Sequence, residues 1–331
     1  MYSSLIIAMP ALLASVAAGA VIDPRIGSPW PTHLDSRVIY QFSNGTTLEN
    51  IAVRSNGNLL VTLTDRPEIY EVNPFDPKDT KLIHHFSGYL GLLGITEVTP
   101  DVFTINVGNF SFETGPAPGS WAIWQLAYHK DQPKVSKITD IPEAAFLNGM
   151  TTLDSASNTI LSGDSTAGVI YSVNTQSGKY KVVLDNEAFK VAPGAPLPIG
   201  LNGIQYLDNY VYYVNSFNPI FGRVRVDKSG SAVGSFNTIA TGVPADDFAI
   251  TKQAAYIAGN IYNVLTEVKQ DGESEAIAGN LNSTLVAGAT SAAFGRTRLD
   301  KHVLYVVTDG AKINPVNGTF TEGGKIVALK I

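Results

Sequence analysis

The sequence contains no cysteine in its 331 residues. Disulfide bonds, thiolate catalysis and cysteine-based metal centres are therefore excluded. Histidine is also scarce, and none of the five has the spacing of metal ligands: they are His33, His84, His85, His129 and His302. The chain also lacks a P-loop, a G-x-G-x-x-G fingerprint and a G-x-S-x-G elbow, so nucleotide, dinucleotide and serine-hydrolase motifs find no support.

Basic side chains are few and scattered. The chain carries 23 lysines and arginines against 29 acidic residues, which gives a formal net charge of −6, and it has no Lys/Arg run. We therefore expect neither nucleic acid nor an anionic membrane surface as a partner. Hydrophobic types make up 44% of the residues, which is enough for a large buried core.

An apolar leader opens the chain. Leu5 to Ala20 is apolar and small, and Ala18-Gly19-Ala20 fits the small-x-small cleavage pattern. This predicts a signal peptide over residues 1–20 and one domain over residues 21–331. A membrane anchor is the alternative, although an apolar stretch of about sixteen residues is short for a span and no later segment is long enough. Four Asn-x-Ser/Thr sequons favour secretion or passage through the secretory route: Asn44, Asn109, Asn282 and Asn317.

An internal repeat predicts the fold. Each copy has short apolar runs separated by Gly, Asn, Asp and Pro, with almost no helical periodicity. Six anchor residues recur at intervals of 44 to 55 residues: Ile51, Ile95, Met150, Ile204, Phe248 and Ala293. Propeller blades repeat at roughly 40 to 50 residues, so we expect an all-β, six-bladed β-propeller. The early strand Val38 to Phe42 has no blade of its own and is expected to complete the last blade; a twin-sheet sandwich is the alternative fold.

Polar residues gather at one end of the expected blades. Strands in a blade alternate in direction, so first-strand starts and second-strand ends lie at the same mouth of the channel. First strands start at Glu49, Asn148, Asn202 and Asp246. Second strands end at or just before Thr64, Asn106, Asp164, Asn215, Asn260 and Asp309. Glu49, Asn148, Asn202 and Asp246 together offer oxygen ligands of the kind that Ca²⁺ prefers, although Asn and Asp also favour turns.

Long insertions are expected at the same mouth. They span residues 107–120, 185–200, 216–221 and 310–323. Three carry apolar groups, among them Phe110, Phe189 and Phe217, which indicates a small apolar ligand or, alternatively, loops that simply fold onto the scaffold. We take as candidate substrate contacts Asn106, Phe110, Asp164, Phe189, Asn215, Phe217 and Asn260.

The blade starts carry a family resemblance. Glu49, Asn148-Gly149, Asn202-Gly203 and Ala245-Asp246-Asp247 stand where the regucalcin/gluconolactonase and strictosidine-synthase-like propellers have their ligand residues, and Gly163-Asp164-Ser165 matches a further blade pattern. The sequence thus resembles the calcium-dependent phosphotriesterase superfamily over nearly the whole mature chain. It departs from that pattern at Asn50-Ile51, where the family has Gly-Pro, and at Asp247, where the family has glycine.

The layout also resembles a fungal subgroup of secreted propellers. The Pro-rich segment at residues 23–31 and the Leu48-Glu49-Asn50, Asn148-Gly149 and Asp246-Asp247-Phe248 starts carry this likeness. Some members are hetero-Diels–Alderases that join a tropolone-derived quinone methide to a terpene alkene. The resemblance implies a pericyclase that needs no cofactor.

Three functions remain open at this stage. In a pericyclase, Asn148 and Asn202 would donate hydrogen bonds to the diene carbonyl, while Glu49, Asp246 or Asp247 would assist loss of water. In a metal-dependent lactonase or esterase, Ca²⁺ on Glu49, Asn148, Asn202 and Asp246 would polarise a carbonyl. A binding propeller without catalysis is the third. The oligomeric state is not predicted.

Overall fold

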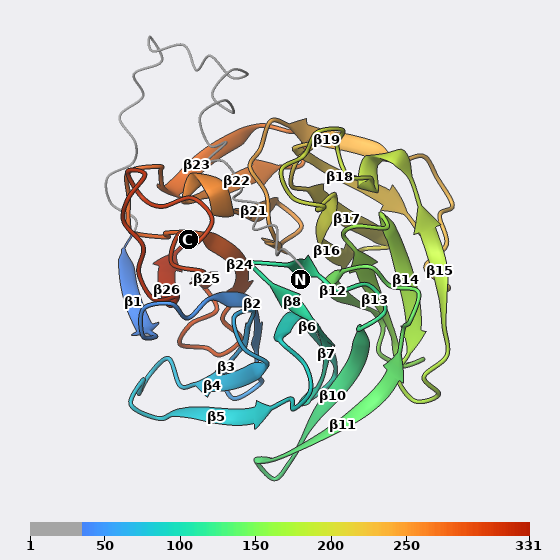
Figure 1. Ribbon diagram of the computed structural model, residues 1–331, viewed down its shortest axis with the longest axis horizontal. Helices are drawn as coiled ribbons and strands as arrows, with labels where there is room; N and C mark the ends of the chain where they lie inside the picture. Colours follow the sequence, from blue (N-terminus) through green and yellow to red (C-terminus); the bar gives the residue numbers. More distant parts are fainter. Residues whose placement is uncertain (1–34) are drawn as a thin grey trace, which may run out of the picture. The chain divides into compact units, whose positions relative to one another are not determined.

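The computed structural model describes residues 35–331 and confirms the six-bladed β-propeller. Six four-stranded antiparallel sheets are arranged around one axis (Figure 1). The predicted leader over residues 1–20 and the Pro-rich segment at 23–31 lie outside the described residues. A membrane-spanning helix is not found in the described part of the chain, where the two helices are three-residue 3-10 turns, η1 (Glu187–Phe189) and η2 (Asn260–Tyr262).

The blades follow one another in chain order, and in five of them the first strand is innermost. Blade 1 contains β2 (Leu48–Val53), β3 (Leu59–Leu63), β4 (Glu68–Val72) and β5 (Thr80–His85). Blade 2 contains β6 (Gly91–Thr99), β7 (Val102–Gly108), β10 (Ala122–His129) and β11 (Gln132–Asp140). Blade 3 contains β12 (Leu147–Asp154), β13 (Thr159–Asp164), β14 (Val169–Asn174) and β15 (Tyr180–Asp185).

The other half of the ring repeats this pattern. Blade 4 contains β16 (Leu201–Leu207), β17 (Tyr210–Asn215), β18 (Ile220–Arg225) and β19 (Asn237–Thr241). Blade 5 contains β20 (Phe248–Ile250), β21 (Ala254–Gly259), β22 (Val264–Lys269) and β23 (Ser274–Gly279). Blade 6 contains β24 (Ala289–Phe294), β25 (Val303–Thr308), β26 (Lys325–Lys330) and β1 (Ser36–Gln41). The insertion after β7 adds a small hairpin of β8 (Phe110–Ser111) and β9 (Gly115–Pro116).

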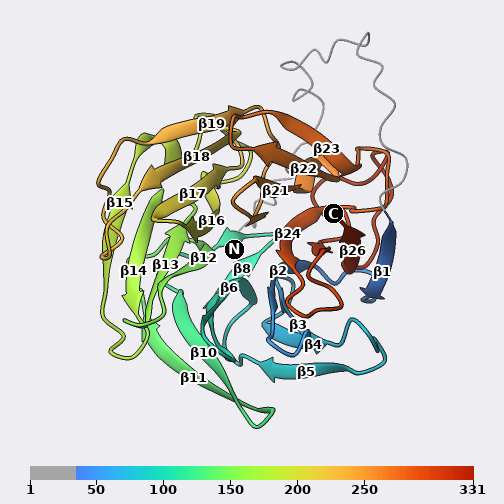
Figure 2. The ribbon, with the colours of Figure 1, turned by 180° about the vertical axis from the view of Figure 1, so that it is seen from behind.

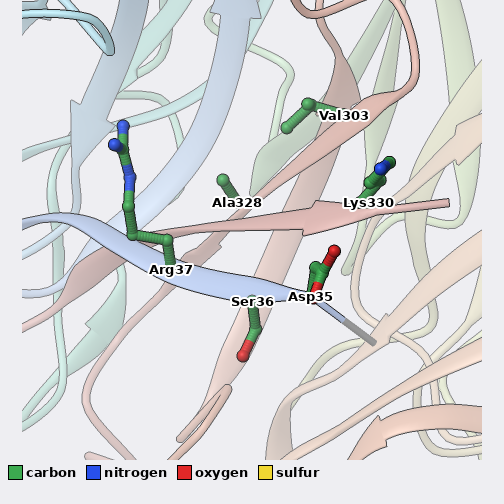
Figure 3. Close-up of a pocket in the computed structure, with 6 residues that line it drawn as sticks. All are labelled: Asp35, Ser36, Arg37, Val303, Ala328 and Lys330. Carbon is green, nitrogen blue, oxygen red and sulfur yellow. The ribbon is translucent and has the colours of Figure 1, made fainter. Parts of the chain in front are cut away.

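The early strand closes the ring, as the sequence predicts. β1 pairs antiparallel with β26 and becomes the outermost strand of blade 6, with Val38 opposite Val327. The first and last strands of the described chain therefore share one sheet, seen from behind in Figure 2. Figure 3 shows the start of β1, where Asp35 and Arg37 face a pocket of about 180 Å³ beside Ala328 and Lys330.

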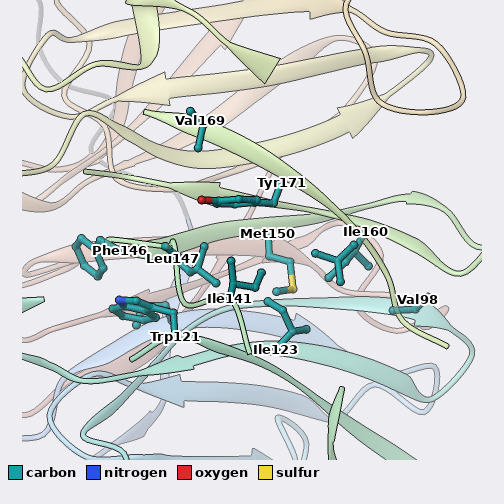
Figure 4. Close-up of a cluster of buried hydrophobic side chains, with 13 residues drawn as sticks. Val98, Trp121, Ile123, Ile141, Phe146, Leu147, Met150, Ile160, Val169 and Tyr171 are labelled. Atoms are coloured by element: carbon teal, nitrogen blue, oxygen red, sulfur yellow. The ribbon is translucent and has the colours of Figure 1, made fainter. Parts of the chain in front are cut away.

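The hydrophobic core lies between neighbouring blades rather than at the axis. Between blades 2 and 3, Trp121 and Ile123 pack against Met150 and Ile160 (Figure 4). Trp121 is completely buried and donates its indole N–H to the carbonyl of Ala145 at 3.0 Å. Similar clusters fill the other inter-blade spaces, so each blade is stabilised by its two neighbours.

One anchor of the sequence repeat needs a correction. In blade 6 the residue equivalent to Ile51 is Ala292 rather than Ala293, because Ala292 pairs with Val306 as Ile51 pairs with Val61. Successive residues of a strand point to opposite faces, so a shift of one residue exchanges a buried side chain for a more exposed one. Ala292 is buried and Ala293 is half-buried, in agreement with this register.

A buried ion-pair network joins blades 1 and 2 at the end of the propeller opposite the predicted mouth. Arg54 follows β2, is 2% exposed, and contacts Glu71, Asp101 and Asp131 at 3.0, 3.0 and 3.1 Å. Its guanidinium carbon lies 3.6 Å from the centre of the Tyr128 ring. A cavity of about 500 Å³ adjoins this network. All three nitrogens of the guanidinium are paired, so Arg54 binds the two blades together.

Arg54→Met should therefore destabilise the fold strongly. Removing one partner of a buried ion pair leaves the others uncompensated, which costs about 3–5 kcal/mol in the free energy of unfolding. Arg66→Met is the matched control, because Arg66 is 41% exposed where it pairs with Asp65, and surface pairs contribute about 0–1 kcal/mol. Urea unfolding followed by tryptophan fluorescence measures both variants. Equal midpoints for the two would contradict the assigned role of Arg54.

Candidate functional site

Each inner strand carries a β-bulge at the same place. Register shifts in blades 1, 2, 3, 4 and 6 mark an extra residue on the inner strand. In blade 5, Asp246 N–H donates to the Ala258 carbonyl while Ala258 N–H donates to the Asp247 carbonyl, so two residues again oppose one. The residue pairs at the bulge are Glu49-Asn50, Leu93-Gly94, Asn148-Gly149, Asn202-Gly203, Asp246-Asp247 and Thr290-Ser291. Bulges redirect side chains, and here they align the four predicted blade-start residues at equivalent positions.

The second position of the bulge decides how closely the blades approach. A Cβ atom on Gly94 would overlap the carbonyl oxygen of Asn148, and one on Gly149 would overlap the carbonyl oxygen of Asn202. A Cβ atom on Gly203 would overlap the carboxylate of Asp247. The inner strands of blades 2 to 5 are thus in contact through their backbones, and only glycine fits at these three positions.

In the remaining sector of the ring, side chains add to the backbone contact, which includes a hydrogen bond from Asp247 N–H to the Thr290 carbonyl at 3.0 Å. Asn50 Nδ2 donates to Asp247 Oδ2 at 2.7 Å, which joins blade 1 to blade 5. Ser291 Oγ of blade 6 donates to Asn50 Oδ1 at 3.3 Å. Phe248 N–H donates to the other carboxylate oxygen of Asp247 at 2.7 Å. Asn50, Asp247 and Ser291 are each at most 5% exposed, so they form a buried polar link at the centre of the ring.

The first position of the bulge contributes to an acidic cluster. Asn202 Nδ2 donates to Asp246 Oδ1 at 2.6 Å and to Ser216 Oγ at 3.0 Å. Asn260, directly after β21, donates from Nδ2 to Asp309 Oδ2 at 3.0 Å. The cluster comprises Glu49, Asp246, Asp247 and Asp309 from blades 1, 5 and 6.

Burial raises the pKa values of these carboxyl groups above their ordinary range. It raises the pKa of Asp247 to about 7 and that of Asp309 to about 6. Burial, followed by repulsion from Asp247 and Asp309, raises the pKa of Asp246 well above its usual range; Glu49 shifts the same way through burial and then repulsion from Asp246, Asp247 and Asp309. Glu49 and Asp246 are only half-buried, so water moderates their shifts. All four groups therefore hold their protons to a higher pH than an exposed carboxyl group does.

The four predicted calcium ligands are two carboxyl groups, Glu49 and Asp246, and two amides, Asn148 and Asn202. Calcium takes six to eight oxygen ligands, and within residues 35–331 no three Asp, Glu or His side chains are grouped as metal ligands. Asn202 presents its amide nitrogen, not its oxygen, to Asp246. Asn148 lies one blade further along, and its side chain forms no hydrogen bond with any described residue. We therefore derive no chemical step through a cation.

The structure uses several predicted substrate contacts within the protein itself. Asp164 is completely buried and accepts four backbone N–H groups, from Ala145, Phe146, Thr166 and Ala167. Asn215 is also completely buried and holds the loop after β15 through the carbonyls of Ala188 and Lys190. Phe189 is 0% exposed and packs edge-on against Tyr213. The sequence interpretation of these three as substrate contacts is corrected to a supporting role, because their surfaces and polar atoms are already occupied.

Three other predicted substrate contacts lie at the same end of the propeller as the acidic cluster. Asn106 is buried and donates to the Asn148 carbonyl at 2.6 Å, so it positions the Asn148 bulge. Phe110 is half-buried and stacks on Phe146 with ring centres 5.2 Å apart. Phe217 is half-buried on the loop between β17 and β18.

The sequence does not single out two residues of the site, Asp309 and Asn50. Asp309 was placed at a second-strand end without a role, yet it belongs to the acidic cluster. Asn50 was recorded only as a departure from a family pattern, yet it holds Asp247. The strand position of Asp309 was a usable signal. Asn50 had none, because its direction depends on a bulge that the sequence does not reveal.

Fold and site together define a six-bladed β-propeller with a buried acidic cluster at one end of its axis. No protein-family model matches the chain. The chain is 29% identical to a protein of Sarocladium schorii named as a hetero-Diels-Alderase, asR5, with 83% of this chain and 78% of the relative covered. It is 28% identical to a second protein of that name from a Phoma species, with 82% and 86% covered.

Solved structures confirm the fold class. The calcium-binding protein regucalcin of Agrobacterium tumefaciens superposes with a TM-score of 0.62 over 90% of this chain and 95% of its own, at 14% identity. Both predicted resemblances, to regucalcin-like propellers and to hetero-Diels-Alderases, are thus confirmed as similarities.

Gly149→Ala should destabilise the ring. The new methyl group would meet the backbone of Asn202, which has no room to move, and overpacking costs about 1–3 kcal/mol or more. Gly234→Ala is the control, since its Cβ would only touch the Arg225 side chain at an ordinary 3.6 Å. Thermal unfolding should give a clearly lower Tm for the first variant and an unchanged Tm for the second. An unchanged Tm for Gly149→Ala would disprove the backbone contact.

The raised pKa of Asp309 predicts a pH-dependent stability. A carboxyl with a folded-state pKa of about 6 and an unfolded value of roughly 3.9 stabilises the fold below pH ~4 and loses that contribution as the pH rises through 6. The loss is on the order of 3 kcal/mol. Asp309→Asn should remove this component, and the Asn260 amide can rotate to accept from the new side chain. Unfolding free energies of both proteins at pH 4 and pH 7.5 measure the difference, and parallel profiles would show that Asp309 is ionised throughout.

Proposed function

We propose that this chain is a pericyclase, a hetero-Diels–Alderase that joins a quinone-methide-type diene to an apolar terpene alkene. The similarity to two proteins of that name over more than four-fifths of the chain is the observation that carries the proposal. The acidic cluster supports it, since carboxyl groups that keep a proton at neutral pH can donate hydrogen bonds and protons.

Formation of the diene would use the cluster as acid and base. The half-buried Glu49, in its protonated form, would give its proton to a departing benzylic hydroxyl, whose C–O bond breaks to release water. A carboxylate of Asp246 would take the proton of the ring hydroxyl, which leaves the neutral quinone methide. The proton given and the proton taken balance, so the cluster as a whole keeps its charge.

The cycloaddition itself would depend on positioning and hydrogen bonding. Holding diene and alkene together can lower the barrier by about 7–11 kcal/mol. Asn148, whose amide has no partner among the described residues, would donate to the carbonyl oxygen of the diene. Asn202 has both amide hydrogens engaged, so its role shifts from donor to positioning Asp246.

Apolar side chains at the same end support an apolar second substrate. The loops there expose Phe112, Leu197, Tyr262 and Phe320 to between 37% and 48%. Phe110 and Phe217 lie half-buried on neighbouring loops. Exposed aromatic and aliphatic groups around a polar floor are typical of sites for apolar small molecules.

We also propose that the protein passes through the secretory route. Asn44, Asn282 and Asn317 are exposed, and Asn109 is half-buried. All four sequons lie on loops at the end of the propeller that carries the acidic cluster, because each follows a strand ending there or precedes one starting there.

The test is a cycloaddition assay with an ortho-hydroxybenzyl alcohol as quinone-methide precursor and an unfunctionalised terpene alkene. The protein should give one stereoisomer of the cyclic ether, where the uncatalysed reaction gives a mixture. Glu49→Gln should slow the reaction by about 10²–10⁴-fold through loss of the acid, and Asn148→Ala by about 10²-fold through loss of a donor. Chelator should leave the rate unchanged.

Glu275→Gln is the matched control, because Glu275 is exposed on the outermost strand of blade 5. A metal-dependent lactonase or esterase is the second candidate, favoured by the oxygen-rich blade starts. Lactone hydrolysis that stops with chelator, together with racemic ether from the protein, would replace the pericyclase proposal by this one.

A further inference from the structure

Two amide oxygens at the acidic cluster are buried without a hydrogen-bond partner. They are Asn202 Oδ1 and Asn260 Oδ1, and neither finds a donor among residues 35–331. The two residues are only 4% and 8% exposed, respectively. Buried acceptors are nearly always paired in proteins, so these two exceptions call for a donor beyond the hydrogen bonds formed among residues 35–331.

The orientation of both amides is fixed by the carboxylates. Asn202 places its nitrogen on Asp246 and on Ser216, and Asn260 places its nitrogen on Asp309. Against an ionised carboxylate, the reverse orientation would set the amide oxygen against a carboxylate oxygen. In this orientation the two amide oxygens are left as acceptors without a donor among the described residues.

Both side chains reach the same carboxyl group. Asn202 and Asn260 both face the carboxyl group of Asp246, Asn202 from blade 4 and Asn260 from the end of β21 in blade 5. The backbone on the Asn260 side is also fixed, since Asn263 Oδ1 accepts from Gly288 N–H at 2.7 Å and Asn314 Nδ2 donates to the Ile261 carbonyl. The two amides therefore meet at one carboxyl group, although they come from different blades.

The chemistry of the site limits the classes of ligand that can bind there. An amide oxygen accepts hydrogen bonds only, so the ligand must bring O–H or N–H groups. The neighbouring acids repel an anion. A neutral molecule with hydroxyl groups satisfies both oxygens without adding charge.

We propose that Asn202 Oδ1 and Asn260 Oδ1 accept hydrogen bonds from hydroxyl groups of the substrate and so select a hydroxylated ring over its ether analogues. This inference rests on the proposed function for placing the substrate at this end of the axis. It assigns Asn202 and Asn260 as specificity residues, distinct from the proton transfer at Glu49 and Asp246.

Binding of three ring probes tests the proposal without any turnover. Catechol has two adjacent hydroxyls, guaiacol has one, and veratrole has none because both are methylated. Isothermal titration should rank the affinities catechol, guaiacol, veratrole, with a loss of roughly two- to tenfold for each hydroxyl removed. Asn202→Ala and Asn260→Ala should each flatten this ranking, and alanine leaves room for water beside the acid that loses its amide.

Asn237→Ala is the control, since Asn237 lies exposed on β19, the outermost strand of blade 4, and should keep the full ranking. Thermal unfolding checks each variant, and if one fails to fold, the other still tests the proposal. Equal affinities of the intact protein for all three probes would overturn it. So would tight calcium binding that Asn202→Ala abolishes, which would assign the oxygens to a cation. A hydroxyl ranking without any cycloaddition would refute the proposed function alone.

Discussion

The close approach of the six innermost strands is the constraint on which the rest of this propeller depends. In blades 2, 3 and 4 the second bulge position is glycine, and a single added carbon would collide with the next blade. Those strands are therefore set by backbone contact. In blades 5, 6 and 1 the same position holds Asp247, Ser291 and Asn50, whose side chains fill the space and bond to one another. The residue at the second bulge position thus divides the ring into a sector with glycine, in blades 2 to 4, and a sector with polar side chains, in blades 5, 6 and 1.

The asymmetry has an electrostatic consequence. All four carboxyls of the cluster come from blades 1, 5 and 6, where the second bulge position carries a side chain. Buried there, they are weaker acids than usual, which makes the ionised cluster a destabilising feature of the fold at neutral pH. Stability must come from elsewhere, and without cysteine it comes from the inter-blade clusters, from the pairing of β1 with β26 and from the Arg54 network. Strain concentrated at one end of a stable scaffold is typical of functional sites.

The sequence predicts the fold better than the site, for physical reasons. Six repeats and an orphan early strand determine the blade number and the closure, because alternation and spacing are properties of the chain alone. Strand ends bring Glu49, Asn202 and Asp246 to one mouth for the same reason. Whether a strand-end polar group faces a ligand or a loop depends on packing, and packing turns Asp164 and Asn215 towards loop backbone. Phe189 was misjudged because a loop aromatic can cover either the scaffold or a substrate.

The two departures from the regucalcin-like pattern acquire a joint meaning in three dimensions. Asn50 and Asp247 stand 197 residues apart, and in sequence they look like unrelated substitutions for glycine. In the structure they are hydrogen-bonded to each other at 2.7 Å across the ring. Either one alone would leave a buried amide or a buried carboxylate without its partner, a costly state. Together they place a carboxyl with a pKa of about 7 where the resembling family has only backbone. The paired change thus converts a position that spaces the blades into one that can hold a proton, which suits acid–base work on a neutral substrate better than the binding of a cation.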